Sequence, residues 1–120
     1  MVNARFARAT DIVRKTRFLL PDHFVGYVFY EDDGRQVGMC WAGWDTRGRP
    51  FLFCELEDEG RKYKYRIARW SKRFVDVLET VCDELYTIED DEEPGAAKWI
   101  EWLGFTETDE RINGQRVMKK

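Results

Sequence analysis

The segment from Gly60 to Cys82 constrains the fold of this chain more than any other stretch. Apolar residues recur there in steps of three and four, the spacing that places side chains on one face of an α-helix of about six turns. The residues of this face are Tyr63, Ile67, Trp70, Phe74, Val77 or Leu78, and Val81. We therefore expect one long amphipathic helix that packs on the rest of the domain along this face.

The charges of this segment run against the dipole of the expected helix. Its first half is basic, with Arg61, Lys62, Lys64, Arg66, Arg69, Lys72 and Arg73, and its acids follow. A cation near the amino end of a helix is unfavourable by about 0.3–1 kcal/mol. Two interpretations stay open. Either the free N–H groups and the cations bind an anion such as phosphate, or these residues form a solvated basic face.

Length and composition indicate a single domain, 1–120, because 120 residues with 43% apolar content suffice for a core. The net charge of −3 hides a basic block at 61–73 and acidic blocks at 55–59 and 89–93. This balance makes general nucleic-acid binding unlikely on electrostatic grounds. No apolar stretch reaches the roughly 18 residues of a membrane span, and the amino end has no apolar signal core. We expect a cytosolic protein in its host cell.

The three cysteines, Cys40, Cys54 and Cys82, are odd in number and far apart in the sequence. We expect them to be reduced thiols within apolar surroundings, not a disulfide framework. His23 is the only histidine, and one histidine cannot build a zinc cluster. No metal site is expected.

The remaining segments predict a mixed α+β domain. Residues 3–9 read as an extended start, and a helix is expected from Thr10 or Asp11 to Leu20, ending before Pro21. Strands are expected at 24–30, 36–44, 51–56 and 85–88. A helix that begins at Pro94 is expected to end at Gly104. The last two strands, 105–112 and 115–118, flank Asn113-Gly114, the strongest hairpin signal in the chain.

This order of elements, together with the sequence from Trp99 to Phe105, resembles the GNAT family of N-acetyltransferases. The family's last helix commonly ends in an aromatic-x-x-Leu-Gly-Phe pattern, and Ala9-Thr10-Asp11 looks like the start of its first helix. The resemblance implies a mixed, mostly antiparallel sheet flanked by helices, with acetyl-CoA as cofactor and an amine or a protein as acceptor. No metal is implied.

Within that family the chain is similar to small GNAT-like proteins of tailed bacteriophages, including the internal virion protein group of podoviruses. Those share a segment rich in lysine and arginine after a glycine, as in the sequence that follows Gly60. This resemblance implies a phage protein of the host cytoplasm or the virion, with a phage or host protein as a possible partner.

The cofactor phosphates would be held, by this resemblance, by Gly60, Arg61, Lys62 and Lys64. The chain departs from the family here, because three acids precede Gly60 and a second glycine is missing. Ile100 stands where many members have a tyrosine that protonates the leaving thiolate, and Glu93 aligns with a frequent asparagine.

Glu55 is the candidate catalytic base, because it ends a predicted strand at the mouth of the expected cleft. Its alternative role is that of a solvated carboxylate. Tyr86 and Tyr63 are candidate acids, and packing residues in the alternative. The acidic run 89–93 either selects a basic amine or metal ions, or is a solvated start of the next helix.

Two functions therefore stay open: an acetyl-CoA-dependent N-acetyltransferase, and a non-catalytic protein that uses the same scaffold to bind a partner. An exposed tryptophan would favour the partner. Trp41 and Trp44 point to opposite faces of one strand, so one of them is expected to approach the surface. Trp99 and Trp102 share a helix, and at least one is expected in the core.

Overall fold

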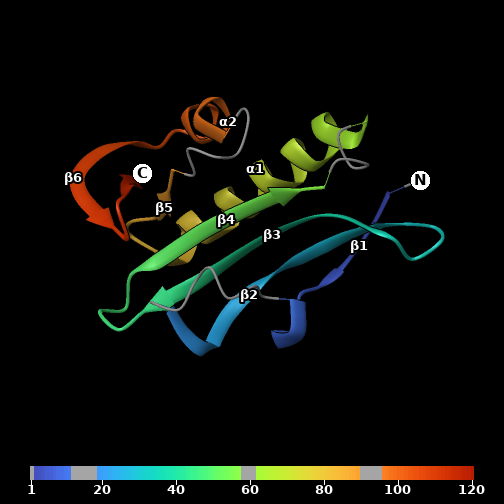
Figure 1. The fold of residues 1–120 in the computed structure, drawn as a ribbon, viewed down its shortest axis with the longest axis horizontal. Coiled ribbons are helices and arrows are strands. Elements are labelled where there is room, and N and C mark those ends of the chain that lie inside the picture. The colour runs from blue at the N-terminus through green and yellow to red at the C-terminus, as the bar shows by residue number, and fades with distance from the viewer. Residues whose placement is uncertain (1, 12–18, 58–61, 90–95) are drawn as a thin grey trace.

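Seven strands form one sheet in the computed structural model, which describes residues 2–11, 19–57, 62–89 and 96–120 (Figure 1). The strands are β1 (Val2–Phe6), β2 (Leu19–Glu31), β3 (Gln36–Asp45), β4 (Pro50–Leu56), β5 (Tyr86–Ile88), β6 (Thr106–Ile112) and β7 (Gln115–Lys119). The helices are the short 3₁₀ helix η1 (Ala9–Asp11), α1 (Lys64–Val81) and α2 (Ala96–Trp102). None of the described helices is long and apolar enough to cross a membrane.

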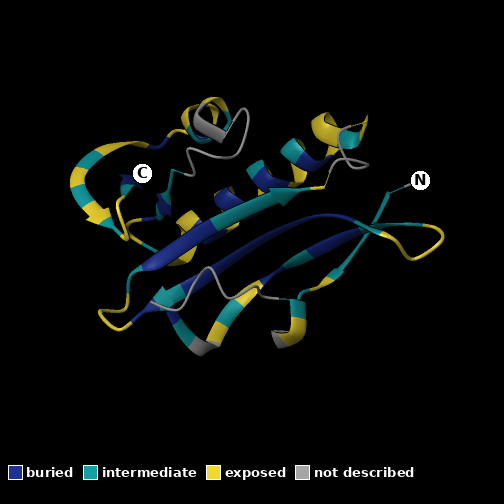
Figure 2. Cartoon of the chain, viewed as in Figure 1, coloured by how far each residue is buried: buried dark blue, intermediate teal, exposed yellow. Residues whose placement is uncertain are grey.

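The strand order is β1-β2-β3-β4-β5-β7-β6. Strands β4 and β5 pair in parallel through the crossover that contains α1, and the other neighbouring strands pair antiparallel. The predicted α+β class, with a mixed and mostly antiparallel sheet, is therefore confirmed. The meander from β2 to β4 forms the centre of the sheet, where β3 is buried along most of its length and β4 over its first three residues (Figure 2).

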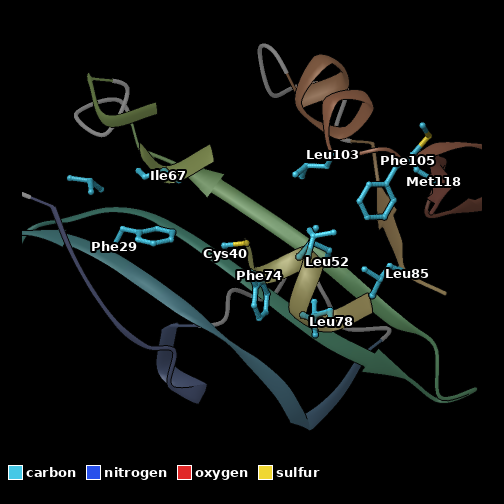
Figure 3. Packing of buried hydrophobic residues seen from close by; sticks show 13 residues of the cluster. Phe29, Cys40, Leu52, Ile67, Phe74, Leu78, Leu85, Leu103, Phe105 and Met118 are labelled. Carbon is cyan, nitrogen blue, oxygen red and sulfur yellow. The ribbon is translucent and has the colours of Figure 1, made fainter. Parts of the chain in front are cut away.

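The main core lies between one face of the sheet and the two helices α1 and α2 (Figure 3). Helix α1 buries five residues against the sheet: Ile67, Ser71, Phe74, Val75 and Leu78. The Ser71 hydroxyl donates to the carbonyl oxygen of Ile67 at 2.9 Å, so its burial leaves no polar group unpaired. A small residue at this position lets the helix approach the sheet closely.

The predicted apolar face of α1 was partly wrong. Trp70 and Val81 are 40% and 77% exposed, whereas Ile67 and Phe74 are buried as predicted. Of the two alternatives at the next position, Leu78 is buried and Val77 is 62% exposed. The contact stripe is centred nearer to Ser71, a polar residue that hydropathy alone does not assign to a core. The three exposed residues lie on the flank of the helix, outside this stripe.

The opposite face of the sheet has its own apolar cluster, built from Leu19, Val28, Met39, Trp41, Phe51 and Val117. Trp41 stacks on Phe53 with ring centres 4.7 Å apart. Trp44 packs against the main core on the other face, so the opposite orientation of these two tryptophans is confirmed, with Trp44 only half-buried. Trp99 also packs against the main core.

The predicted helix from Thr10 to Leu20 was wrong at both of its described ends. Thr10 and Asp11 belong to η1, and Leu19 and Leu20 begin strand β2, while residues 12–18 lie outside the described residues. Leu19 pairs with Asp45 of β3. The proline after Leu20 also disfavours helical backbone at that residue, a signal present in the sequence.

The predicted turns at the carboxyl end are confirmed. Gly104 ends α2 with φ +97°, and Asn113 and Gly114 have φ of +52° and +81°, as a two-residue hairpin turn requires. Strand β5 is one residue shorter than predicted. Leu85 precedes it, buried, with its N–H and carbonyl oxygen both paired to Lys120.

Candidate functional site

Strands β4 and β5 diverge after a short parallel contact. Only two residue pairs join them, Phe51 with Tyr86 and Leu52 with Thr87, yet β4 continues to Leu56 (Figure 1). Strand β4 thus extends beyond its ladder contact with β5. This opening lies at the end of the sheet where α1 begins.

Helix α1 begins without a side-chain cap. Tyr63 occupies the N-cap position and makes no capping hydrogen bond, and the first turn contains no acidic residue. Lys64 is exposed at the first helical position, with its Nζ 5.1 Å from the centre of the Tyr65 ring. At the helix start, no side chain among the described residues accepts a hydrogen bond from the first N–H groups. Cations lie beside these N–H groups, and this arrangement suits a phosphate group.

Lys62, a predicted phosphate ligand, is paired within the chain. Its Nζ lies 3.0 Å from Oε1 of Glu31, at the end of β2, and Arg35 binds the other carboxylate oxygen at 2.8 Å. The contacts with Lys62 and Arg35 lower the pKa of Glu31 from 4.5 to about 2, and the same pair raises the pKa of Lys62. Glu31 was not predicted, because only folding brings it to Lys62.

Glu55 and Tyr86, the two predicted catalytic residues, are not brought together. Glu55 lies in the part of β4 that has left β5, whereas Tyr86 pairs with Phe51 at the closed end. Four strand positions separate Phe51 from Glu55, which is about 13 Å at the usual rise per residue. The two side chains therefore do not reach one reacting atom in this structure.

The Tyr86 hydroxyl already has a partner. It donates to Oε2 of Glu84 at 2.6 Å, and this hydrogen bond raises the pKa of Tyr86. Its ring stacks on Phe51, with centres 5.5 Å apart, and the Arg49 guanidinium lies 5.2 Å from the ring centre. A cleft of about 470 Å³ beside Tyr86 is lined in part by Trp44 and Val81, and so lies near the carboxyl end of α1.

The other predicted positions are of two kinds. Two segments lie outside the described residues: 58–61, which includes Gly60 and Arg61, and 90–95, which includes Glu93. Tyr63 and Ile100 are described, and both pack against the main core. Within the described ranges no three His, Cys, Asp or Glu side chains form a group that could hold a metal. The expectation of a metal-free site stays a prediction.

Comparison with known proteins identifies the fold. Neither a protein-family model nor a curated protein matches the sequence. Among solved structures, the spermidine N-acetyltransferase SpeG from Vibrio cholerae is 14% identical, with 99% of this chain and 92% of that chain covered and a TM-score of 0.64. The chain has a GNAT-like fold.

Two further structures support this GNAT-like fold. A putative acyl-CoA N-acyltransferase from Klebsiella pneumoniae is 12% identical, with 100% of this chain and 97% of that chain covered and a TM-score of 0.63. A putative GNAT-family acetyltransferase from Bordetella pertussis is 11% identical, with 80% of this chain and 63% of that chain covered and a TM-score of 0.62. At such identities the likeness concerns the fold alone.

Proposed function

We propose that this chain is an acyl-CoA N-acyltransferase that binds acetyl-CoA in the opening between β4 and β5. The observation that carries the proposal is the divergence of these strands at the end where α1 begins uncapped. The helix start offers N–H groups to the phosphates of the cofactor. Bound acetyl-CoA would supply an activated thioester for transfer to an amine.

The residues present fit this ligand in part. Lys64 is exposed at the first turn of α1 and is the described cation best suited to a phosphate. Lys62 would contribute either by sharing its charge between Glu31 and a phosphate or by breaking its ion pair with Glu31. We retain Gly60 and Arg61 as phosphate ligands on the family resemblance.

Glu55 is the proposed general base, because it belongs to the diverging part of β4. An amine acceptor is proposed by analogy with the spermidine enzyme among the similar structures. Tyr86 is a candidate acid only for a thiolate at the closed end of the strand pair, away from Glu55, and its hydrogen bond with Glu84 would have to break first. Tyr86→Phe tests this role, because loss of an acid lowers kcat whereas loss of a packing hydroxyl does not.

The test is calorimetric titration with acetyl-CoA and CoA. The parent protein is expected to bind at micromolar concentration, and the double variant Lys62→Glu, Lys64→Glu is expected to bind at least about tenfold more weakly. Lys72→Glu is the control, because it makes half of this charge change about two turns beyond Lys64 along α1. Similar loss in the control would show a general charge effect and contradict the site.

The second candidate is a non-catalytic phage protein that binds a virion or host protein through the GNAT-like scaffold. Two features favour it: Ile100 has no proton to donate, and Lys62 is held by Glu31. No heat with millimolar acetyl-CoA would overturn the enzyme proposal and leave this candidate.

A further inference from the structure

The basic block of α1 is divided between two flanks of the helix. Arg66, Arg69 and Arg73 follow at steps of three and four and form one exposed stripe. Among the residues that the structure describes, none of these arginines forms an ion pair. Lys72 pairs with Asp76 at 3.3 Å, and Asp76 lies beside the stripe, three residues after Arg73.

Aromatic side chains lie beside this stripe. Trp70 projects between α1 and β2, with its ring centre 5.9 Å from that of Tyr27 and 6.2 Å from that of Phe29. Phe6 of the edge strand β1 stacks on Tyr27 at 5.2 Å. Phe6 remains 68% exposed and Trp70 40% exposed. Exposed and buried residues alternate along α1, because one side of the helix faces the sheet and the other faces solvent (Figure 2).

We call the set Phe6, Tyr27, Trp70, Arg66, Arg69 and Arg73 the aromatic–arginine surface. Its rings are held in place by mutual packing across β1, β2 and α1, and Tyr27 also meets Phe74 edge-on at 5.9 Å. A surface that is already ordered loses little side-chain entropy on binding. Tryptophan, tyrosine and arginine are also the residues that contribute most at protein interfaces.

The charges identify the partner. Guanidinium groups bind carboxylates through two parallel hydrogen bonds. Among the described residues, the three arginines of the stripe form no ion pair with a carboxylate. We propose that the aromatic–arginine surface binds an acidic segment of a partner protein that carries an aromatic side chain among its carboxylates. A nucleic acid fits less well, because the net charge of −3 repels a dense polyanion.

This surface does not depend on the proposed acyltransferase activity. Trp70 faces β2, whereas the opening proposed for acetyl-CoA lies between β4 and β5. Substitutions of Arg69 and Arg73, which lie beyond the first turn of α1, are therefore expected to leave acetyl-CoA binding unchanged.

The test measures fluorescence anisotropy of a labelled glutamate-rich peptide that contains phenylalanine. The triple variant Arg66→Ala, Arg69→Ala, Arg73→Ala and the single variant Phe6→Ala are each expected to weaken binding by about tenfold or more. Lys72→Ala is the control and is expected to change it by less than about twofold. Phe6 lies largely exposed on an edge strand, so its variant keeps the fold.

Four outcomes would overturn the proposal. Equal peptide binding by the parent and the triple variant, or no binding by the parent, would exclude an acidic partner here. Tighter binding of oligothymidylate, with a steep dependence on salt, would make the surface a nucleic-acid site. A reversible dimer in sedimentation that Phe6→Ala abolishes would make a second copy of the chain the occupant.

Discussion

The guanidinium group of Arg49 binds both carboxylate oxygens of Glu110, 61 residues further along the chain, at 2.7 and 2.9 Å. Its Nε also donates to Asp45 at 2.8 Å. Burial alone would raise the pKa of Asp45, but hydrogen bonds from Arg49 and Arg47 lower it. One side chain thus joins the turn between β3 and β4 to β6, across the ring of Tyr86.

Glu110→Gln is expected to destabilise the protein by about 1–2 kcal/mol, because it weakens a charged pair in a partly buried cluster. Partial exposure of the Glu110 side chain keeps the value below that of a fully buried pair. Urea denaturation measures the change. Glu107→Gln is the control, since its pair with Arg116 is largely exposed, and a change below about 0.5 kcal/mol is expected. Equal effects of the two variants would contradict the prediction.

Asp11→Asn is expected to destabilise the protein at neutral pH and to have no effect near pH 2. Two hydrogen bonds from Arg5 and one from the Arg8 N–H lower the pKa of Asp11 from 3.8 to about 2. A carboxyl group whose folded pKa is lowered stabilises the folded state above its unfolded pKa, and this stabilisation is lost as the pH falls to the folded value. Denaturation at several pH values tests this, with the exposed Asp109→Asn as control.

Cys40 is expected to resist alkylation in the folded protein. It is fully buried beside Cys54, with the two sulfur atoms 3.1 Å apart, and burial raises the pKa of its thiol. Cys82 lies in a partly exposed cleft and is expected to react faster. Iodoacetamide labelling followed by peptide mass spectrometry gives the order. Native-state labelling of Cys40 at the rate of Cys82 would show that this part of the core opens readily.

Lys64→Glu is expected to stabilise the folded protein by about 0.5 kcal/mol while weakening acetyl-CoA binding. The replacement puts a negative charge at the uncapped amino end of α1, where the dipole favours it and a phosphate would not. Thermal unfolding and calorimetric titration measure the two effects. A variant that is destabilised and binds equally well would remove Lys64 from the proposed site.

Gly26→Ala is expected to destabilise the protein by about 3 kcal/mol. A Cβ atom on Gly26 would lie 2.3 Å from the Cβ of Trp41 and 2.5 Å from the carbonyl oxygen of Cys40, so the backbone of β3 would have to shift. Val25→Ala, at an exposed neighbouring position, is the control for denaturant unfolding. A small effect of Gly26→Ala would mean that β2 and β3 can separate at little cost.

Local sequence signals predicted the fold where one residue type dictates backbone shape. Asn113-Gly114 and Gly104 were found in this way, because each needs a positive φ. Ser71 was missed because its burial depends on a hydrogen bond to Ile67, which hydropathy does not register. Leu19 was assigned to a helix because its pairing with Asp45 is a long-range contact that no local pattern reveals.

The candidate site was less predictable than the fold. The position of Lys64 at a helix start followed from the amphipathic pattern, since the helix begins within a turn of the expected residue. The pairing of Lys62 with Glu31 and the separation of Glu55 from Tyr86 follow from strand register, which a single sequence does not specify.

The contacts of Arg49 also bear on how the sheet can move. Its guanidinium rests over Phe51 and Tyr86, the first residue pair of the contact between β4 and β5, and its link to Glu110 closes that end. The strand pair is therefore fixed at the Arg49 end, so that any opening would take place toward the start of α1.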